Sequence, residues 1–347
     1  MKVKLGDVCE RGSSNLKQSD VVGMSGDYPI YGAAGYLGNV DFYHQEKPYV
    51  AVVKDGAGIG RTTLHPAKSS VIGTMQYLLP KSNILPEYLY YVVSYKHLEK
   101  YFTGATIPHI YFKDYKNEKF NLDSLDMQKK IVDILSKCEG IIKSRNRELE
   151  LLDELVKARF VEMFGDPVLN DKKFSTLSGE DFFKLSNGKA VPEEKRHEVG
   201  IPAYGGNGIS WYTNEVLRVE DTLVVGRVGF QSGNVHYAVG PLWITDNAMY
   251  ISQYDKGKIN LGFLCELMQR VNFSRFQDAG DLKKITQKPF MSFQYILPSM
   301  ELQQKFVDFK EQIDKSKVNY YYKNRKDGFP PLLFIYSVTT ITNLPGC

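Results

Sequence analysis

"AVVKDGAGIGRT", Ala51 to Thr62, and "VVGRVGFQSGNV", Val224 to Val235, are two versions of one segment. Each begins with small and β-branched residues and continues with glycines and polar side chains. In this alignment Gly56 lies over Gly229 and Gly60 over Gly233. Because glycine tolerates positive φ, shared glycines between two extended runs predict a strand, a glycine turn and a second strand in each copy.

The repeat extends well beyond this segment, which makes it the first feature to account for. "PIYGAAGYLG", Pro29 to Gly38, returns as "PAYGGNGIS", Pro202 to Ser210. "FNLDSLDMQKKIVDIL", Phe120 to Leu135, returns as "YILPSMELQQKFVDFK", Tyr295 to Lys310, with Gln128 over Gln303. The chain therefore contains one β-rich unit followed by a helix, present twice.

The glycines at Gly56 to Gly60 also resemble a phosphate-binding loop, but the flanking residues argue against one. A dinucleotide site needs a helix directly after the glycines, and a P-loop needs Gly-Lys-Ser/Thr. Here Arg61 to His65 form a β-type run that ends at Pro66. A hairpin turn is the better prediction.

A long helix is expected between the two β-rich parts. The stretch from Leu125 to Phe164 has no proline and one glycine, and would run about 60 Å as a helix. Apolar residues recur in alternating steps of three and four, with Arg145 filling one missing step, and this is the heptad seam of a coiled coil. The predicted seam is Ile131, Leu135, Cys138, Ile142, Leu149, Leu152 and Val156, and in the second copy Leu302, Phe306, Phe309 and Ile313. Packing of each helix on its own globular part is the simpler alternative, but the helix length favours an antiparallel pair.

Composition sets broad limits. At 347 residues and 43% hydrophobic, the chain is long enough for two domains. The four cysteines, Cys9, Cys138, Cys265 and Cys347, are far apart without a C-x-x-C pair, so we expect free thiols. No leader or membrane-spanning run is evident, and a cytoplasmic protein without membrane contact is the expectation. A net charge of +4 is too small to indicate a polyanion partner by itself.

Polar groups offered at the tips of the two predicted turns are suited to base edges and phosphates. Ordinary solvated turn residues are the alternative for each of them, and the two tyrosines are equally suited to packing in the core. The candidate DNA-contacting residues are Tyr31, Lys54, Arg61, Thr62, Thr106 and His109 in the first copy, and Tyr204, Asn207, Arg227, Gln231, Asn234, Lys283 and Thr286 in the second.

Signs of catalysis are missing from the sequence. The histidines show no metal-ligand spacing, no Gly-x-Ser-x-Gly elbow occurs, and no methyltransferase loop is found. We therefore predict no catalytic residue, no metal and no cofactor.

The order of these segments resembles the specificity subunit of type I restriction-modification systems. The likeness lies in "KLGDV" (Lys4 to Val8), "TGATIPHI" (Thr103 to Ile110), "EMFGDP" (Glu162 to Pro167) and the repeated segments above. The resemblance implies an α+β fold: two tandem β-rich α/β target-recognition domains, separated by two long helices in an antiparallel coiled coil, with a pseudo-twofold internal repeat.

The resemblance also implies a non-catalytic subunit that reads a bipartite site in double-stranded DNA, one domain per half-site, while the helices fix the spacer. Its implied partners are two modification (methyltransferase) subunits and, indirectly, a restriction subunit. The implied boundaries are residues 1–122 and 166–297 for the recognition domains, 123–165 and 298–326 for the helices, and 327–347 for a tail.

That tail departs from the repeat. Pro330 and Pro331 prevent the second helix from reaching the length of the first, and the coiled coil would lose part of one strand.

Two other functions stay open on the sequence: a stand-alone sequence-specific DNA-binding protein, and a pair of β-rich domains that bind protein or glycan. Apolar residues beyond the seam, namely Leu151, Leu155 and Phe160, favour a partner-docking helix.

Overall fold

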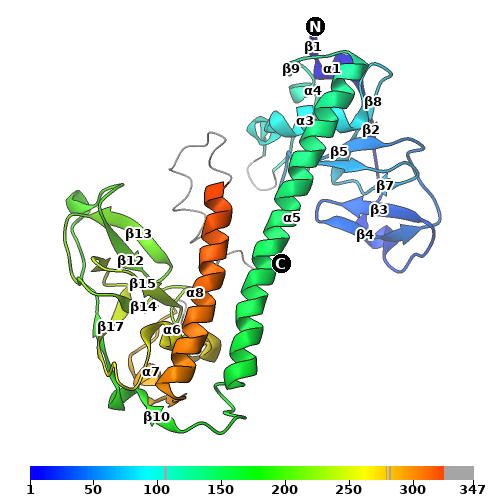
Figure 1. Ribbon diagram of the computed structural model, residues 1–347. Coiled ribbons are helices and arrows are strands. Elements are labelled where there is room, and N and C mark those ends of the chain that lie inside the picture. Colours follow the sequence, from blue (N-terminus) through cyan, green and yellow to red (C-terminus); the bar gives the residue numbers. More distant parts are fainter. Residues whose placement is uncertain (105–107, 279, 281–282, 324–347) are drawn as a thin grey trace. The chain divides into compact units, whose positions relative to one another are not determined.

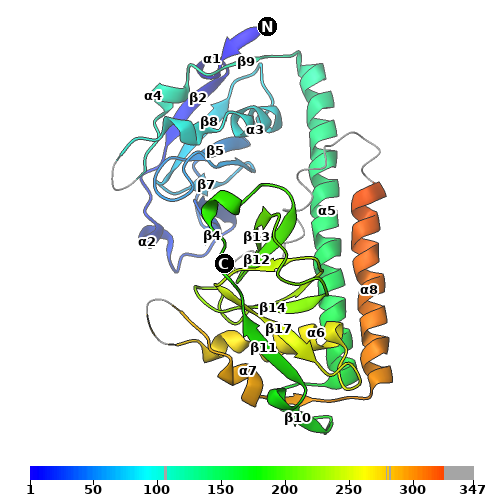
Figure 2. The same ribbon diagram turned by 90° about the vertical axis from the view of Figure 1, so that its left-hand side faces the viewer.

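The computed structural model describes residues 1–104, 108–278, 280 and 283–323. It divides into two compact units, Met1–Arg145 and Asn146–Cys347, and the division falls inside one helix. Figures 1 and 2 show the elements of both. The predicted tail and Thr106 lie outside the described residues.

The first unit is built on three small sheets. Their strand orders are β1-β9, β2-β8-β5-β6 and β4-β3-β7. The strands are β1 (Lys2–Lys4), β2 (Cys9–Ser13), β3 (Tyr28–Gly32), β4 (Gly35–Val40), β5 (Tyr49–Val53), β6 (Thr62–His65), β7 (Ser70–Val71), β8 (Met75–Pro80) and β9 (Lys119–Asn121). The helices are α1 (Leu5–Val8), α2 (Gln18–Val21), α3 (Pro86–Tyr95), α4 (Phe112–Tyr115) and the 3-10 turn η1 (Leu98–Tyr101).

The second unit repeats this topology strand for strand. Its sheets have the orders β10-β18, β11-β17-β14-β15 and β13-β12-β16. The strands are β10 (Thr176–Ser178), β11 (Phe183–Asn187), β12 (Ile201–Gly205), β13 (Gly208–Thr213), β14 (Thr222–Gly226), β15 (Val235–Ala238), β16 (Trp243–Ile244), β17 (Ala248–Tyr254) and β18 (Gln294–Ile296). The helical elements are η2 (Gly179–Asp181), η3 (Glu193–Lys195), α6 (Leu261–Val271), η4 (Phe273–Phe276), α7 (Lys288–Ser292) and α8 (Met300–Lys323). The predicted internal repeat is thus present in the fold.

The equivalent strands β5 and β14 lie inside the four-stranded sheets, and every residue of both is buried. Their sequences, YVAVV and TLVVG, consist mostly of β-branched and other apolar residues, which pack well on both faces of a central strand. In the first unit Val50 and Val52 face one core cluster while Ala51 and Val53 face another, as the two-residue period of a strand requires. These strands hold the turns that follow them.

The long helix α5 spans Leu125–Phe164, as predicted. Its first turns pack on the first unit, where Ile131 and Val132 contact the core. Its last turns enter the core of the second unit, where Phe160 and Phe164 are fully buried against Phe306 of α8. Both interpretations of the helix are therefore partly right, because it packs on globular cores as well as on a second helix.

Within the second unit, α8 lies antiparallel beside the later half of α5 (Figure 2). Phe306 meets Phe160, and Lys317 of α8 pairs with Asp153 of α5. Extending this register at about 1.5 Å per residue in both helices places Lys323 opposite the region of Arg147. Residues of α5 before Arg147 thus lie past the described end of α8.

That register explains how the seam residues are distributed. In the later half of α5, Leu149 and Val156 are buried and Leu152 is half-buried, while Phe306 of α8 is fully buried and Leu302, Phe309 and Ile313 are half-buried. In the earlier half, Leu135, Cys138 and Ile142 are exposed. The described residues thus form the helix pair only from Leu149 onward.

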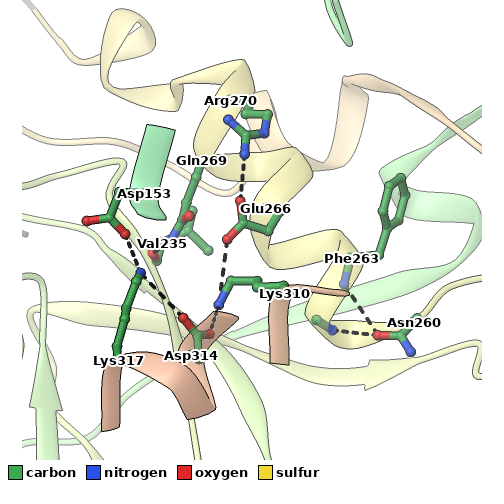
Figure 3. Close-up of polar contacts among 11 residues, drawn as sticks. Asp153, Val235, Asn260, Phe263, Glu266, Gln269, Arg270, Lys310, Asp314 and Lys317 are labelled. Carbon is green, nitrogen blue, oxygen red and sulfur yellow. Dashed lines mark hydrogen bonds and ion pairs between the residues drawn. The ribbon is translucent and has the colours of Figure 1, made fainter. Parts of the chain in front are cut away.

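A chain of charged side chains joins three helices of the second unit (Figure 3). Glu266 of α6 is 2.9 Å from Arg270 and 3.9 Å from Lys310 of α8. Lys310 pairs with Asp314 at 2.6 Å, and Asp314 and Asp153 both contact Lys317. Burial alone would lower the pKa of Lys310, but the hydrogen bond and charge of Asp314, together with Glu266, raise it above its usual value. This series of ion pairs links α5, α6 and α8 to one another.

A buried glutamine attaches the start of each long helix to its unit. Gln128 Oε1 accepts a hydrogen bond from the Leu85 backbone N–H at 2.9 Å, and Gln303 Oε1 accepts one from Asn260 at 2.8 Å. Both side-chain amides donate to two backbone carbonyls. Since Gln128 and Gln303 are fully buried, each must find these partners to be tolerated in the core.

Candidate nucleic-acid interface

The first glycine turn joins β5 to β6, and no helix follows it, so the hairpin prediction is confirmed. Gly56, Gly58 and Gly60 have φ of 85°, 85° and 83°. A Cβ on Gly60 would lie 2.6 Å from the backbone nitrogen of Glu99. Glycine is required here both for its positive φ and for this close approach.

The second turn, between β14 and β15, is built the same way. Gly229 and Gly233 have φ of 91° and 92°. A Cβ on Gly233 would lie 2.6 Å from the backbone nitrogen of Ser274. The shared glycines predicted from the alignment are therefore equivalent in conformation and in packing.

A later segment of the chain runs beside each turn, and the same two backbone hydrogen bonds join segment and turn in both units. In the first unit the Ile110 N–H donates to the Lys54 carbonyl at 2.9 Å, and the Gly56 N–H to the Pro108 carbonyl at 3.0 Å. In the second unit the Ile285 N–H donates to the Arg227 carbonyl at 3.0 Å, and the Gly229 N–H to the Lys283 carbonyl at 2.8 Å. Candidate residues that lie about 55 positions apart in sequence are thus brought to one place.

In the first unit this arrangement gathers charged groups around one carboxylate. Asp55 Oδ2 is 3.2 Å from Lys54 Nζ, and its Oδ1 is 2.7 Å from His109 Nδ1. Arg61 Nη1 donates to the Ala33 carbonyl at 3.0 Å, which ties the turn to the β3–β4 hairpin. Thr62 donates to the Gly60 carbonyl at 3.2 Å. These side chains bring possible donors together from two segments of the chain, the glycine turn and the segment that contains His109.

In the second unit the equivalent place has no carboxylate at its centre, because Val228 stands where Asp55 stands in the first unit. Arg227 Nη1 donates to the Asp246 carbonyl at 3.2 Å, and the Asn234 side-chain amide donates to Gln231 Oε1. Lys283 contributes its carbonyl to the frame of the turn, and Thr286 is exposed further along the same segment. Asn207, on the β12–β13 hairpin, lines a hollow together with Gln231.

Tyr31 and Tyr204, the two tyrosines among the candidate residues, are half-buried and pack on the core of their units. The Tyr31 ring is 4.3 Å from the His65 ring and packs on a buried cluster. Tyr204 packs on the equivalent cluster of the second unit. Burial raises the pKa of both phenols. Both belong to the packing that supports the turns.

Three prominent residues at these turns were not singled out from the sequence. Asp55 is the carboxylate that Lys54 and His109 share, and its position inside the glycine turn was the available signal. Phe230 is 86% exposed, and an aromatic residue directly after a turn glycine was a signal too. Trp211 lies beside this turn through the fold alone, and nothing in its local sequence marks it.

Among the docking residues predicted on α5, Leu151 and Leu155 are exposed, but the prediction for Phe160 was wrong. Phe160 is fully buried because its position on the helix faces α6, where its ring stacks 6.0 Å from Phe263.

Over the described ranges, no group of histidine, cysteine, aspartate and glutamate side chains has a metal-binding arrangement. No helix there has the length and hydropathy needed to cross a membrane. Cys9, Cys138 and Cys265 are free thiols, as expected, and Cys347 lies outside the described part.

The fold and the paired turns define a class: proteins with two equivalent β-rich domains on long helices. Comparison with known proteins gives the family. The model of the type I restriction modification DNA specificity domain matches residues 1–152 and 171–320, so this chain belongs to that family.

Relatives agree with this assignment. The type I restriction enzyme MjaVIII specificity subunit of Methanocaldococcus jannaschii is 30% identical over 128 residues, 36% of this chain and 30% of that protein. The EcoprrI specificity subunit of Escherichia coli is 25% identical over 191 residues, 52% of this chain and 46% of that protein. The chain therefore matches less than half the length of either relative.

A solved structure covers more of the chain. The type I restriction-modification system S subunit from M. genitalium aligns with 100% of this chain and 96% of its own, with a TM-score of 0.67 and 17% identity. That similarity supports the fold.

Proposed function

We propose that this chain reads a bipartite site in double-stranded DNA as the specificity subunit of a type I restriction-modification complex. Each unit reads one half-site with the groups at its glycine turn, and the helices α5 and α8 set the unread spacer. The chain itself carries out no chemistry, and methylation belongs to modification subunits that dock on it.

One observation supports the reading role most directly: the same backbone frame occurs twice with different side chains at its tip. The glycines, the carbonyl bonds and the sheets are equivalent in the two units. The half-buried side chains at the tips differ, since Lys54 and Asp55 in one turn correspond to Arg227 and Val228 in the other. Base edges in the major groove are distinguished by the donors and acceptors offered to them, so two such tips read different half-sites.

The docking role rests on α5. Leu151 and Leu155 are 47% and 45% exposed, and Ile141 and Ile142 are 61% and 60% exposed. Apolar side chains at this density on one helix are typical of a surface that another protein covers. We assign modification subunits as the partners, two of them to match the twofold repeat, and the restriction subunit would be reached through them.

The test is to co-express the chain with a modification subunit from its own operon and to map adenine methylation across the host genome. We expect two short defined blocks around a fixed gap. Arg61→Ala should relax one block and Gln231→Ala the other, so that each variant serves as the control for its counterpart. A stable complex that methylates without any motif would contradict the reading role.

Salt dependence tests the alternatives. Binding of the complex to duplex DNA should weaken steeply with salt, because phosphate contacts release counterions. Binding that is indifferent to salt would favour a protein or glycan ligand instead. Specific DNA binding by the chain alone, with no modification subunit captured, would favour a stand-alone DNA-binding protein.

A further inference from the structure

A hollow in the second unit lies beside its glycine turn. It is lined by aromatic side chains and a buried hydroxyl, which contacts with base edges alone would not need. Its volume is about 560 Å³, which is within the usual range of ligand sites. Its walls come from the turn, the β12–β13 hairpin and the residues after β16. Gly205 and Gly206 line it without side chains, which leaves the interior open.

A buried hydroxyl without a partner lines this hollow. Thr245 is 6% exposed, and its Oγ1 has no hydrogen-bond partner among the described residues. A buried hydroxyl left unpaired costs about 1 to 3 kcal/mol, so such groups are normally satisfied. Because Thr245 faces the hollow, a ligand seated there is the natural source of its partner.

The remaining walls indicate what that ligand is. Phe230 offers an exposed ring, and Trp211 offers an indole with the Arg196 guanidinium 5.2 Å from its centre. Asp246 and Asn247 add a carboxylate and an amide. Flat aromatic surfaces favour a flat ligand, the amide and carboxylate favour an edge that carries donors and acceptors, and the carboxylate disfavours a phosphate.

We propose that this hollow binds one nucleobase of the second unit's half-site, unstacked from the duplex. The base lies against Trp211 and Phe230 and presents its edge to Thr245. A base that stays in the stack has no free face for an aromatic ring and cannot reach a residue buried as deeply as Thr245. The inference rests on the proposed DNA-reading function and specifies how one of the two units performs it.

The first unit lacks the same chemistry at equivalent positions. The bond from the Ile72 N–H to the Tyr31 carbonyl corresponds to that from the Thr245 N–H to the Tyr204 carbonyl, which aligns Ile72 with Thr245. By the equivalent strand pairings and turn glycines, Gly38 stands in place of Trp211 and Ala57 in place of Phe230. Only the second half-site is therefore read with an unstacked base.

The test uses the complex with its modification subunits and a duplex that carries the methylation motif. A single mismatch is placed in turn at each position of the block assigned to the second unit. Since a mismatch lowers the cost of unpairing, one position should bind about 10-fold tighter or more when mismatched. If every mismatch weakens binding or leaves it unchanged, the base is read in the stack and the inference fails.

Variants locate the effect. Phe230→Ala and Trp211→Ala should each weaken binding by about 10-fold or more, as loss of base–aromatic stacking does, and should abolish the mismatch preference. Thr245→Val should weaken discrimination at that one position without lowering the resistance of the protein to urea, because the hydroxyl has no partner in the protein. Leu169→Ala is the matched control, an apolar residue 76% exposed outside the hollow.

The outcomes separate the two proposals. If the wild type gives a bipartite motif but Phe230→Ala and Thr245→Val bind and methylate as it does, the hollow is not a base site while the reading role stands. If the wild type forms the complex and gives no motif, both proposals fail.

Discussion

The buried glutamine at the start of α8 provides the sharpest test of how the helices are held to the recognition units. Gln303→Ala removes the acceptor for the Asn260 N–H and the donors for the Lys258 and Pro298 carbonyls, bonds of 2.8, 3.0 and 2.9 Å. At about 1 kcal/mol for each bond, we expect a loss of about 3 kcal/mol in the free energy of unfolding. For a unit of this size that corresponds to a fall in melting temperature of about 6 to 12 °C.

The chain contains a convenient reporter. Both of its tryptophans, Trp211 and Trp243, lie in the second unit, so tryptophan fluorescence during urea unfolding follows that unit alone. Gln303→Ala should shift this transition, whereas Gln128→Ala, the equivalent change in the first unit, should leave it in place and shift only the far-UV circular dichroism.

Gln304→Ala is the matched control, because Gln304 is the next residue on the same helix but is exposed. Its removal should cost less than about 0.5 kcal/mol. The reasoning is refuted if Gln303→Ala costs no more than Gln304→Ala.

Three further predictions concern the turns, the ion pairs and pH. Gly233→Ala should lower the unfolding free energy of the second unit by well over the roughly 1 to 2 kcal/mol of positive φ alone, because its Cβ meets backbone; Gly229→Ala, with nothing within 4 Å, should show only that smaller cost in the same fluorescence assay. Glu266→Ala should cost about 3 kcal/mol or more in the free energy of unfolding, because it leaves the largely buried Arg270 guanidinium without its carboxylate partner, whereas Lys195→Ala at an exposed pair should leave the free energy of unfolding nearly unchanged. Burial lowers the pKa of His65 to about 4. From about pH 6.5 downward the unfolded chain therefore binds a proton on this histidine that the folded chain does not. The contribution of neutral His65 to the free energy of unfolding is complete above about pH 6.5 and is lost as the pH falls toward 4. The free energy of unfolding should therefore fall between pH 7 and pH 4 by about 3 kcal/mol more in the wild type than in His65→Gln. An equal fall in the two proteins would contradict the lowered pKa of His65.

Much of the frame was accessible from the sequence because it depends on local rules applied twice. Two glycines at matching places, flanked by strand-forming runs, gave the hairpins around Gly56 and Gly229. The absence of proline and the three-and-four spacing gave α5 over its full length. A repeat also tests itself, since a signal present in both copies is unlikely to be accidental.

The burial of Phe160 and the hollow of the second unit were not predicted, because each depends on contacts between segments that lie far apart in the sequence. The heptad pattern left Phe160 outside the seam, but its ring contacts both Phe306 of α8 and Phe263 of α6 and is fully buried between them. The hollow combines Trp211, Phe230 and Thr245 from three separate segments, and no local pattern brings them together. Choosing candidate residues for their polarity therefore missed Trp211 and Phe230.

The proposed reading of two half-sites requires one frame that can carry two different sets of side chains. Their backbone is fixed by glycines with positive φ and by bonds between backbone groups, so its shape does not depend on the side chains at the tip. Ala57 in the first turn corresponds to Phe230 in the second, and Asp55 corresponds to Val228, yet the backbone bonds that hold the two turns are equivalent. Ala57 and Phe230 are exposed, whereas a Cβ on Gly60 or Gly233 would meet backbone atoms, so the side chains at the tips can change at a lower cost in stability than these glycines can.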